Sequence, residues 1–431
     1  MVNLVGKQYE YCVNQCFSTS LSAVDIEEII RTTMIAASKY QFNIISIIAD
    51  GAQCNRQFQK RYFIHGNKGM ENTDYTAHMV HPITSQPVYY ISDPSHMIKK
   101  CVSSLSSKTR NIFMQVNGED HQLSLSIMMD LWLSFNDHSG LNRFKEFKMI
   151  DFVKNSFQCM RVGPCIKVLG PHMIEMIDVA LQYKTKYVEF NDDPNNNKEN
   201  NPYSNYKDAE KYRGWRIACV WFSKLFSILN STEKRLNTEM YAENLQFLQD
   251  FYDWFKSWKV ECIARTPKTL NTNHTSYEEM TGFFTAEATE DCLSMLQGII
   301  QMTKYYCNLQ KSQNRSIYFI PRRISQDLVE NGFARVRLGT KHCRLDHITT
   351  SSSCTKINVS KEVKSSERSS RKRNIKEVKD ENNEEIKKEE PWTEYIIKCK
   401  EDAIEKKKNV SSKGTEYVWE IINGIEILTL R

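Results

Sequence analysis

The sequence predicts an α/β fold that continues into a long helical region and a charged tail. Two short apolar runs, Phe42–Ala49 and Gln86–Ser92, are each followed by a helical pattern, as in a parallel sheet covered by helices. Apolar residues then recur with helical spacing from about Leu123 to Gln310. After about Thr349 the chain is charged, mixed in sign and nearly free of aromatic residues, which is typical of a disordered linker.

Composition sets the broad class. With 431 residues, 40% of them hydrophobic, the chain is long enough for two or three globular domains. Its net charge of +6 permits nucleic-acid binding without requiring it. Thirteen cysteines without a Cys-x-x-Cys pair indicate reduced thiols, as in the cytosol or nucleus. No apolar run approaches the length of a membrane span, so we expect no membrane partner.

Local signals predict the first elements. Val2–Phe17 is rich in Val, Tyr and Phe and predicts one strand. Ser22–Tyr40 predicts a helix, with Ser22 as its N-cap and Asp25 at the capping-box position. Asp93 and Pro94 predict the start of another helix, because an acid before a proline suits the cap and the first helical position.

Further signals lie later in the chain. Four tryptophans at helical spacing (Trp215, Trp221, Trp254 and Trp258) predict core packing, with stacking on nucleic acid as the alternative. Phe190–Asp208 is polar and predicts a disordered loop, and Ser325–Arg337 predicts a helix. Two apolar runs flank Asn423-Gly424 and predict a β-hairpin.

Two acids stand at predicted strand ends. Asp50 and Asp93 follow the two apolar runs, and ligands of open α/β sheets sit beyond the carboxyl ends of the strands. Several carboxylates gathered there can hold Mg²⁺ or Mn²⁺, and a metal pair can activate water against a phosphodiester. The alternative is structural: Asp50 before Gly51 also suits a turn, and Asp93 a helix cap.

Three segments carry a family resemblance. "IADGAQCNRQF", "YYISDPSHMIKK" and "RRISQDLVENGFARVR" stand in the order of three blocks that are similar to those of P-element-type transposases, the group that often carries a THAP zinc finger. The matching residues are Asp50, Gly51, Ala52, Asn55 and Arg56; Asp93, Pro94, His96 and Lys99; and Gln326, Asp327, Glu330, Phe333 and Arg337. The resemblance covers roughly residues 1–340.

The resemblance implies a partial ribonuclease-H-like sheet interrupted by a mainly helical insertion domain. On this basis we expect the first part of the core at 1–120, the insertion at 121–315, an acidic helix completing the core at 316–348, a disordered linker at 349–412 and a hairpin at 413–431. The implied activity is metal-dependent DNA cleavage and strand transfer.

The resemblance also implies roles for residues. Asp50 would be the second catalytic carboxylate and Glu330 the third, with Asp327 as a supporting acid and Asp93 as a further metal ligand or a structural residue. DNA contacts would come from Arg56, His96, Lys99 and Lys100, for which an ordinary helix surface is the alternative.

Several features depart from the pattern. The family's first catalytic acid, in an Asp-Glu-Met strand, has no counterpart before Asp50, and no THAP finger is present. In the family's guanine-reading pattern this chain has Phe226 and Asn230, but Ser227 replaces the acid. A hydroxyl cannot accept both guanine N–H groups, so Ser227 argues against GTP, and core packing is the alternative for Phe226.

These observations predict a truncated or host-adopted transposase that is catalytically incomplete. It would be nuclear, would bind DNA and would form a homo-oligomer. Ser369–Lys376 resembles a nuclear import signal, for which a solvated basic run in the tail is the alternative. The alternatives are a non-catalytic DNA- or protein-binding module and a nucleotide-binding regulatory protein.

Overall fold

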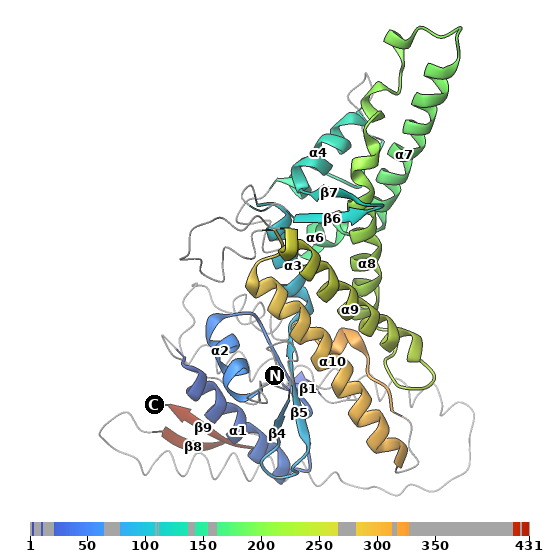
Figure 1. The fold of residues 1–431 in the computed structure, drawn as a ribbon. Coiled ribbons are helices and arrows are strands. Elements are labelled where there is room, and N and C mark those ends of the chain that lie inside the picture. The colour runs from blue at the N-terminus through green and yellow to red at the C-terminus, as the bar shows by residue number, and fades with distance from the viewer. Residues whose placement is uncertain are drawn as a thin grey trace, which may run out of the picture. The chain divides into compact units, whose positions relative to one another are not determined.

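The computed structural model describes residues 21–63, 78–107, 110, 112–136, 143–153, 162–265, 282–312 and 317–326, and the backbone of four further short strands. The fold is mixed α/β and mostly helical, with small sheets (Figure 1). The chain divides into two units: Met1–Ile45, Val80–Val88 and Gln326–Arg431 form the first, and Ser46–Met79 and Tyr89–Ser325 the second.

The first unit contains helix α1 (Ala23–Lys39) and two antiparallel strand pairs. Ser22 caps α1 with the reciprocal Asp25 contact, which confirms the predicted capping box. One pair joins β1 (Val2–Asn3) to β2 (Glu10–Tyr11), and the other joins β8 (Tyr417–Ile422) to β9 (Ile425–Leu430). The second pair confirms the hairpin that Asn423-Gly424 predicted.

A small sheet of order β3-β5-β4 carries both acids that follow strands. Strand β3 (Ser46–Ala49) pairs parallel with β5 (Pro87–Ser92), and β4 (His78–Val80) lies on the other side of β5. The parallel pairing is the one that the two apolar runs predicted. The middle strand of the three is β5, and it is more buried than β3.

Each of these strands leads into a helix. Helix α2 (Gln53–Tyr62) follows β3, and α3 (Pro94–Leu105) follows β5, with Asp93 as its N-cap and Pro94 in its first turn, as predicted. The alternation of strand and helix therefore places the start of both helices at the same sheet edge.

The middle of the chain is helical, as predicted. Its elements are α4 (Leu125–Ser134), α5 (Met149–Phe152), α6 (Val162–Val168), α7 (Pro171–Asp192), α8 (Arg213–Leu229), α9 (Ala242–Arg265) and α10 (Ala286–Ser312), with a last short 3₁₀ turn, η6 (Pro321–Arg323). Figure 1 shows α7 and α8 running side by side.

Aromatic side chains form the core of this helical region. The fully buried members come from α8, α9 and the segment before α10: Trp215, Phe222, Phe251, Phe255, Phe283 and Phe284. Trp258 is also buried, while Trp221 and Trp254 are half-buried and stack with ring centroids 4.9 Å apart. The prediction of core packing is confirmed for Trp215 and Trp258.

The sequence reading missed a hairpin at the start of this region. Strands β6 (Ile112–Val116) and β7 (Glu119–Leu123) pair antiparallel around Asn117 and Gly118. Both turn residues have positive φ, 53° and 87°, as a two-residue hairpin turn of the primed type requires. The same Asn-Gly signal that identified the C-terminal hairpin was therefore present here.

The prediction of a disordered loop at Phe190–Asp208 was wrong. Helix α7 continues to Asp192, and three 3₁₀ turns follow: η2 (Lys198–Asn200), η3 (Ser204–Tyr206) and η4 (Ala209–Tyr212). The buried Asn201 side chain donates to the Tyr187 carbonyl (3.0 Å) and accepts from the Tyr203 N–H (2.8 Å). Asparagines in this stretch act as turn residues, and composition alone does not show that.

Helix α10 crosses β5 at very short range. A Cβ atom at Gly298 would lie 2.2 Å from the Tyr90 carbonyl oxygen. Only glycine allows this approach, because a side chain would collide with the backbone of the strand.

In the part of the chain that the structure describes, no helix combines the length and apolar character that crossing a bilayer requires.

The contact at Gly298 yields a stability prediction. Gly298→Ala should lower the free energy of unfolding by about 2 kcal/mol, because α10 must move away from β5. The matched control is Gly163→Ala in α6, where the added Cβ meets no atom within 4 Å and the change should stay within about 1 kcal/mol. Urea denaturation measures both, and equal effects would contradict the close packing.

Candidate functional site at the tips of β3 and β5

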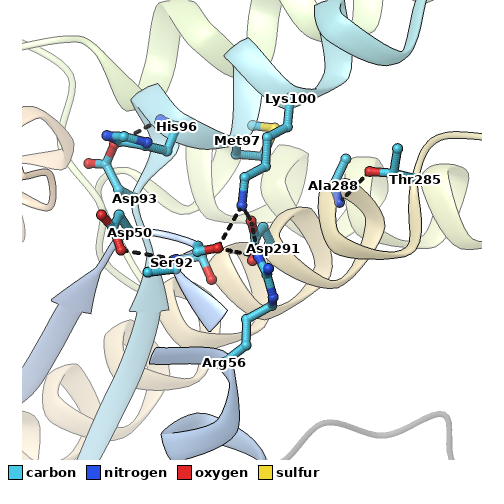
Figure 2. A network of polar contacts seen from close by, with 12 residues as sticks. Asp50, Arg56, Ser92, Asp93, His96, Met97, Lys100, Thr285, Ala288 and Asp291 are labelled. Carbon is cyan, nitrogen blue, oxygen red and sulfur yellow. Dashed lines mark hydrogen bonds and ion pairs between the residues drawn. The ribbon is translucent and has the colours of Figure 1, made fainter. Parts of the chain in front are cut away.

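The two strands bring Asp50 and Asp93 to one edge of the sheet. Ala49 pairs with Ser92 at the ends of the strands, and the Asp93 N–H donates to the Ala49 carbonyl at 2.9 Å. The two acids therefore follow neighbouring strand ends, as Figure 2 shows. Helix α3, which carries His96, Lys99 and Lys100, begins at the same edge.

Asp50 combines a turn role with one unused oxygen. Its Oδ1 accepts from the Ala52 N–H at 3.0 Å and from Asn55 Nδ2 at 2.7 Å. These contacts form an Asx turn that starts α2, so the structural interpretation of Asp50 holds for this oxygen. Oδ2 makes no hydrogen bond to any residue that the structure describes, and the side chain is half-buried. Asn55 thus fixes the carboxylate and leaves one oxygen for a ligand.

Asp93 is a helix cap. Its Oδ2 accepts from the His96 N–H at 2.8 Å, and the residue is only 1% exposed. A carboxylate turned into the first turn of a helix stabilises the free N–H groups there. The structural interpretation of Asp93 is therefore the one that its geometry supports.

The four basic residues proposed for DNA contact fall into two pairs. His96 and Lys99 are half-buried on α3, with Lys99 Nζ 3.4 Å from His96 Nε2. Arg56 and Lys100 instead turn toward a third acid, Asp291 on α10 (Figure 2). Lys100 Nζ donates to Asp291 Oδ2, and Arg56 Nη1 lies 3.9 Å from the same oxygen.

Sequence reasoning missed Asp291. It lies in the helical region, 191 residues from Lys100, and its side chain is 2% exposed. Burial raises the pKa of this carboxyl above its ordinary value, and the contacts with Lys100 and Arg56 oppose that rise. The one available signal is an acid among the apolar residues of "DCLSML", on a helix that is otherwise almost wholly buried there.

A polar seam continues from Asp291 along α10. The hydroxyls of Ser92 on β5 and Ser294 on α10 lie 2.8 Å apart in the core. The buried Tyr90 phenol is nearby, and its pKa is raised chiefly by burial and further by the charges of Asp291 and Asp50. Buried residues of β5 and α10 therefore form a low-dielectric side of the site.

The described residues do not by themselves fit a divalent cation. Asp50 offers one oxygen, while Asp93 serves the α3 N-terminus and Asp291 is bound by Lys100. Within the described ranges, no group of three or more His, Cys, Asp or Glu side chains converges on one point. The predicted ligand Glu330 and the supporting Asp327 lie outside the described residues, as does most of the predicted helix Ser325–Arg337.

The residues considered for GTP lie elsewhere, on α8. Phe226 is buried, in agreement with the core alternative, while Asn230 is exposed at the C-terminal cap of the helix. Between them Ser227 donates to the Lys224 carbonyl at 2.8 Å and accepts from Lys234 at 2.9 Å.

The two lysines that are adjacent on α3 should respond differently to neutralisation. Lys100→Met leaves Asp291 buried with Arg56 as a distant partner, so it should lower the free energy of unfolding by about 3 kcal/mol. Lys99→Met removes a half-exposed charge and should change it by less than about 1 kcal/mol. Chemical denaturation monitored by tryptophan fluorescence tests the difference, and a Lys99→Met effect as large as that of Lys100→Met would contradict this assignment.

Comparisons with known proteins show the fold alone. No family model matches the sequence, and no curated protein matches it. Among solved structures the chain is similar to the Drosophila P element transposase strand transfer complex, with 14% identity and a TM-score of 0.50. The match covers 77% of this chain and 63% of that chain, so this chain spans less than two thirds of its length. The chain therefore has a transposase-like fold.

Proposed function

We propose that this protein derives from a P-element-type transposase and acts on DNA through the edge of the sheet at which Asp50 lies. The observation that carries the proposal is the Asp50 carboxylate, held at a parallel strand end by Asn55, with a second oxygen that accepts no hydrogen bond from the described residues. The fold likeness supports the same reading, and so do the three sequence blocks.

The proposed core is a ribonuclease-H-like sheet with β3 and β5 as two of its strands. In this proposal Asp50 is a ligand for Mg²⁺ or Mn²⁺, and Glu330 and Asp327 supply the further carboxylates. A bound divalent cation would supply Lewis-acid stabilisation of a phosphodiester. This chain's own contribution is orientation: Asn55 and the Ala52 N–H fix one Asp50 oxygen, so that the other is presented at a constant position.

Cleavage by this chain alone should be weak or absent. Of the three described acids at the site, Asp93 and Asp291 are already bound by protein groups, so Asp50 is the one of these three that could serve a metal pair beside the proposed ligands Glu330 and Asp327. The same observation favours a second candidate, a non-catalytic DNA-binding module. For both candidate functions we propose a nuclear location, because Ser369–Lys376 resembles an import signal.

DNA binding should depend on Lys99 more than on Lys100. Among the described residues no carboxylate pairs with Lys99, and its neutralisation as Lys99→Gln should weaken duplex binding and lower the slope of log affinity against log salt by about 1. Lys198→Gln, a surface change in η2, is the control and should leave the slope unchanged. Fluorescence anisotropy at several salt concentrations measures both, and a flat salt response of the unmodified protein would contradict DNA binding.

Asp50 separates the two candidate functions. If Asp50 is a metal ligand, Asp50→Asn should weaken Mn²⁺ binding in calorimetry at least tenfold and abolish any Mn²⁺-dependent nicking of duplex DNA. If the protein is a binding module, the same change should leave DNA affinity unaltered and no nicking should be seen in either protein. Efficient cleavage by the unmodified chain would contradict the expectation of weak activity.

A further inference from the structure

Asp291 joins three helices at one point. The carboxylate belongs to α10, Lys100 comes from α3, and Arg56 comes from α2 (Figure 2). Asp291 Oδ1 has no hydrogen-bond partner among the described residues, so the interactions of this carboxylate run through Oδ2 toward the two cations. A buried carboxylate in this position compensates two positive charges that would otherwise repel each other.

The same two cations bind the peptide that follows Asp50. Lys100 Nζ donates to the Gly51 carbonyl at 3.2 Å, and Arg56 Nη1 donates to the same oxygen. The space beside Gly51 is filled, because a Cβ there would lie 1.7 Å from Lys100 Nζ and 2.3 Å from Asp291 Oδ2. The turn that carries Asp50 is therefore held between its own Asn55 contact and the cations that Asp291 fixes.

We propose that Asp291 is a positioning residue for Asp50, which acts through Lys100, Arg56 and the Gly51 carbonyl. The pairing of β3 with β5 and the bond from the Asp93 N–H to the Ala49 carbonyl fix the strand end before the turn. The hydrogen bond from Lys100 to Gly51 ties the turn itself to the second turn of α3, and Asp291 holds Lys100 in place for it. The importance of this positioning for a ligand rests on the proposed function.

The neighbouring residue on α10 offers a matched control. Glu290 also forms an ion pair with α2, with its Oε1 3.0 Å from Lys60 Nζ, but this pair is solvent-exposed and does not contact Gly51. Glu290→Gln and Asp291→Asn therefore each remove one carboxylate between the same two helices. They differ in whether the Asp50 turn loses its support.

The primary experiment is hydrogen exchange, followed by mass spectrometry, on the full chain without DNA or metal. Asp291→Asn should speed exchange of the amides at 50–56 at least tenfold, while Glu290→Gln should change it less than twofold. Peptides from α8 serve as the internal reference for global unfolding. Unchanged exchange at 50–56 in Asp291→Asn, or an equal increase in α8, would overturn the proposal.

A second pair of variants covers the case in which Asp291→Asn fails to fold. Lys100→Gln should reproduce the local increase at 50–56, whereas Lys100→Arg, which keeps a cationic donor, should restore at least part of the protection. If the ion pair between Lys100 and Asp291 served global stability alone, Lys100→Arg would not restore the protection from exchange at 50–56 specifically. If both Lys100 variants exchange like the unmodified protein at 50–56, the positioning role is excluded.

Mn²⁺ calorimetry links the positioning to the proposed function. Asp291→Asn should weaken the Asp50-dependent affinity about tenfold, and should have no effect in an Asp50→Asn background. Absence of Mn²⁺ binding to the unmodified protein would reject the metal site and leave the exchange result to decide the positioning role. Metal binding that is equal in Asp291→Asn and the unmodified protein would reject the positioning role and leave the metal site intact.

Discussion

The packing of α10 on β5 is the contact on which the site depends. Three residues on one face of α10 make it: Gly298 lets the helix touch the strand backbone, Ser294 bonds to Ser92, and Asp291 reaches the cations beside Asp50. Their spacing of three and four residues places them in one row along the helix. The close approach at Gly298 therefore sets the depth at which the carboxylate of Asp291 lies.

Charge pairing explains why adjacent basic residues differ in whether their charge is available to a ligand. Lys100 and Arg56 are drawn into a buried cluster with Asp291 and the Gly51 carbonyl, so their charge is largely used within the protein. Lys99, one residue earlier on α3, contacts only the His96 ring among the interactions described. Basic residues that are adjacent in the sequence therefore have different roles. Those on the side of α3 that meets α10 form structural ion pairs, and those on another side keep their charge for a ligand such as DNA.

Local signals predicted helix α1 and the elements that carry Asp50 and Asp93. Ser22 and Asp25, Asp93 and Pro94, and the apolar runs before Asp50 and Asp93 each gave the correct cap or strand, because these patterns act within a few residues. The hairpin at Asn117-Gly118 was equally predictable and was overlooked. The apolar neighbours of Asp291 in "DCLSML" indicate a buried acid, but its partners were not predictable, since they lie in other helices far away in the sequence.

The long separation between Lys100 and Asp291 has a consequence for how the chain acquires its structure. During synthesis the strands and the turn at Asp50 emerge early, whereas α10 follows only after the whole helical region, 191 residues beyond Lys100. Contacts between such distant segments form late and slow folding, because a large loop must close before they contribute free energy. The Asp50 turn is therefore expected to acquire its final order in the last steps of folding, and a nascent chain would pass through a long interval with the ion cluster unassembled.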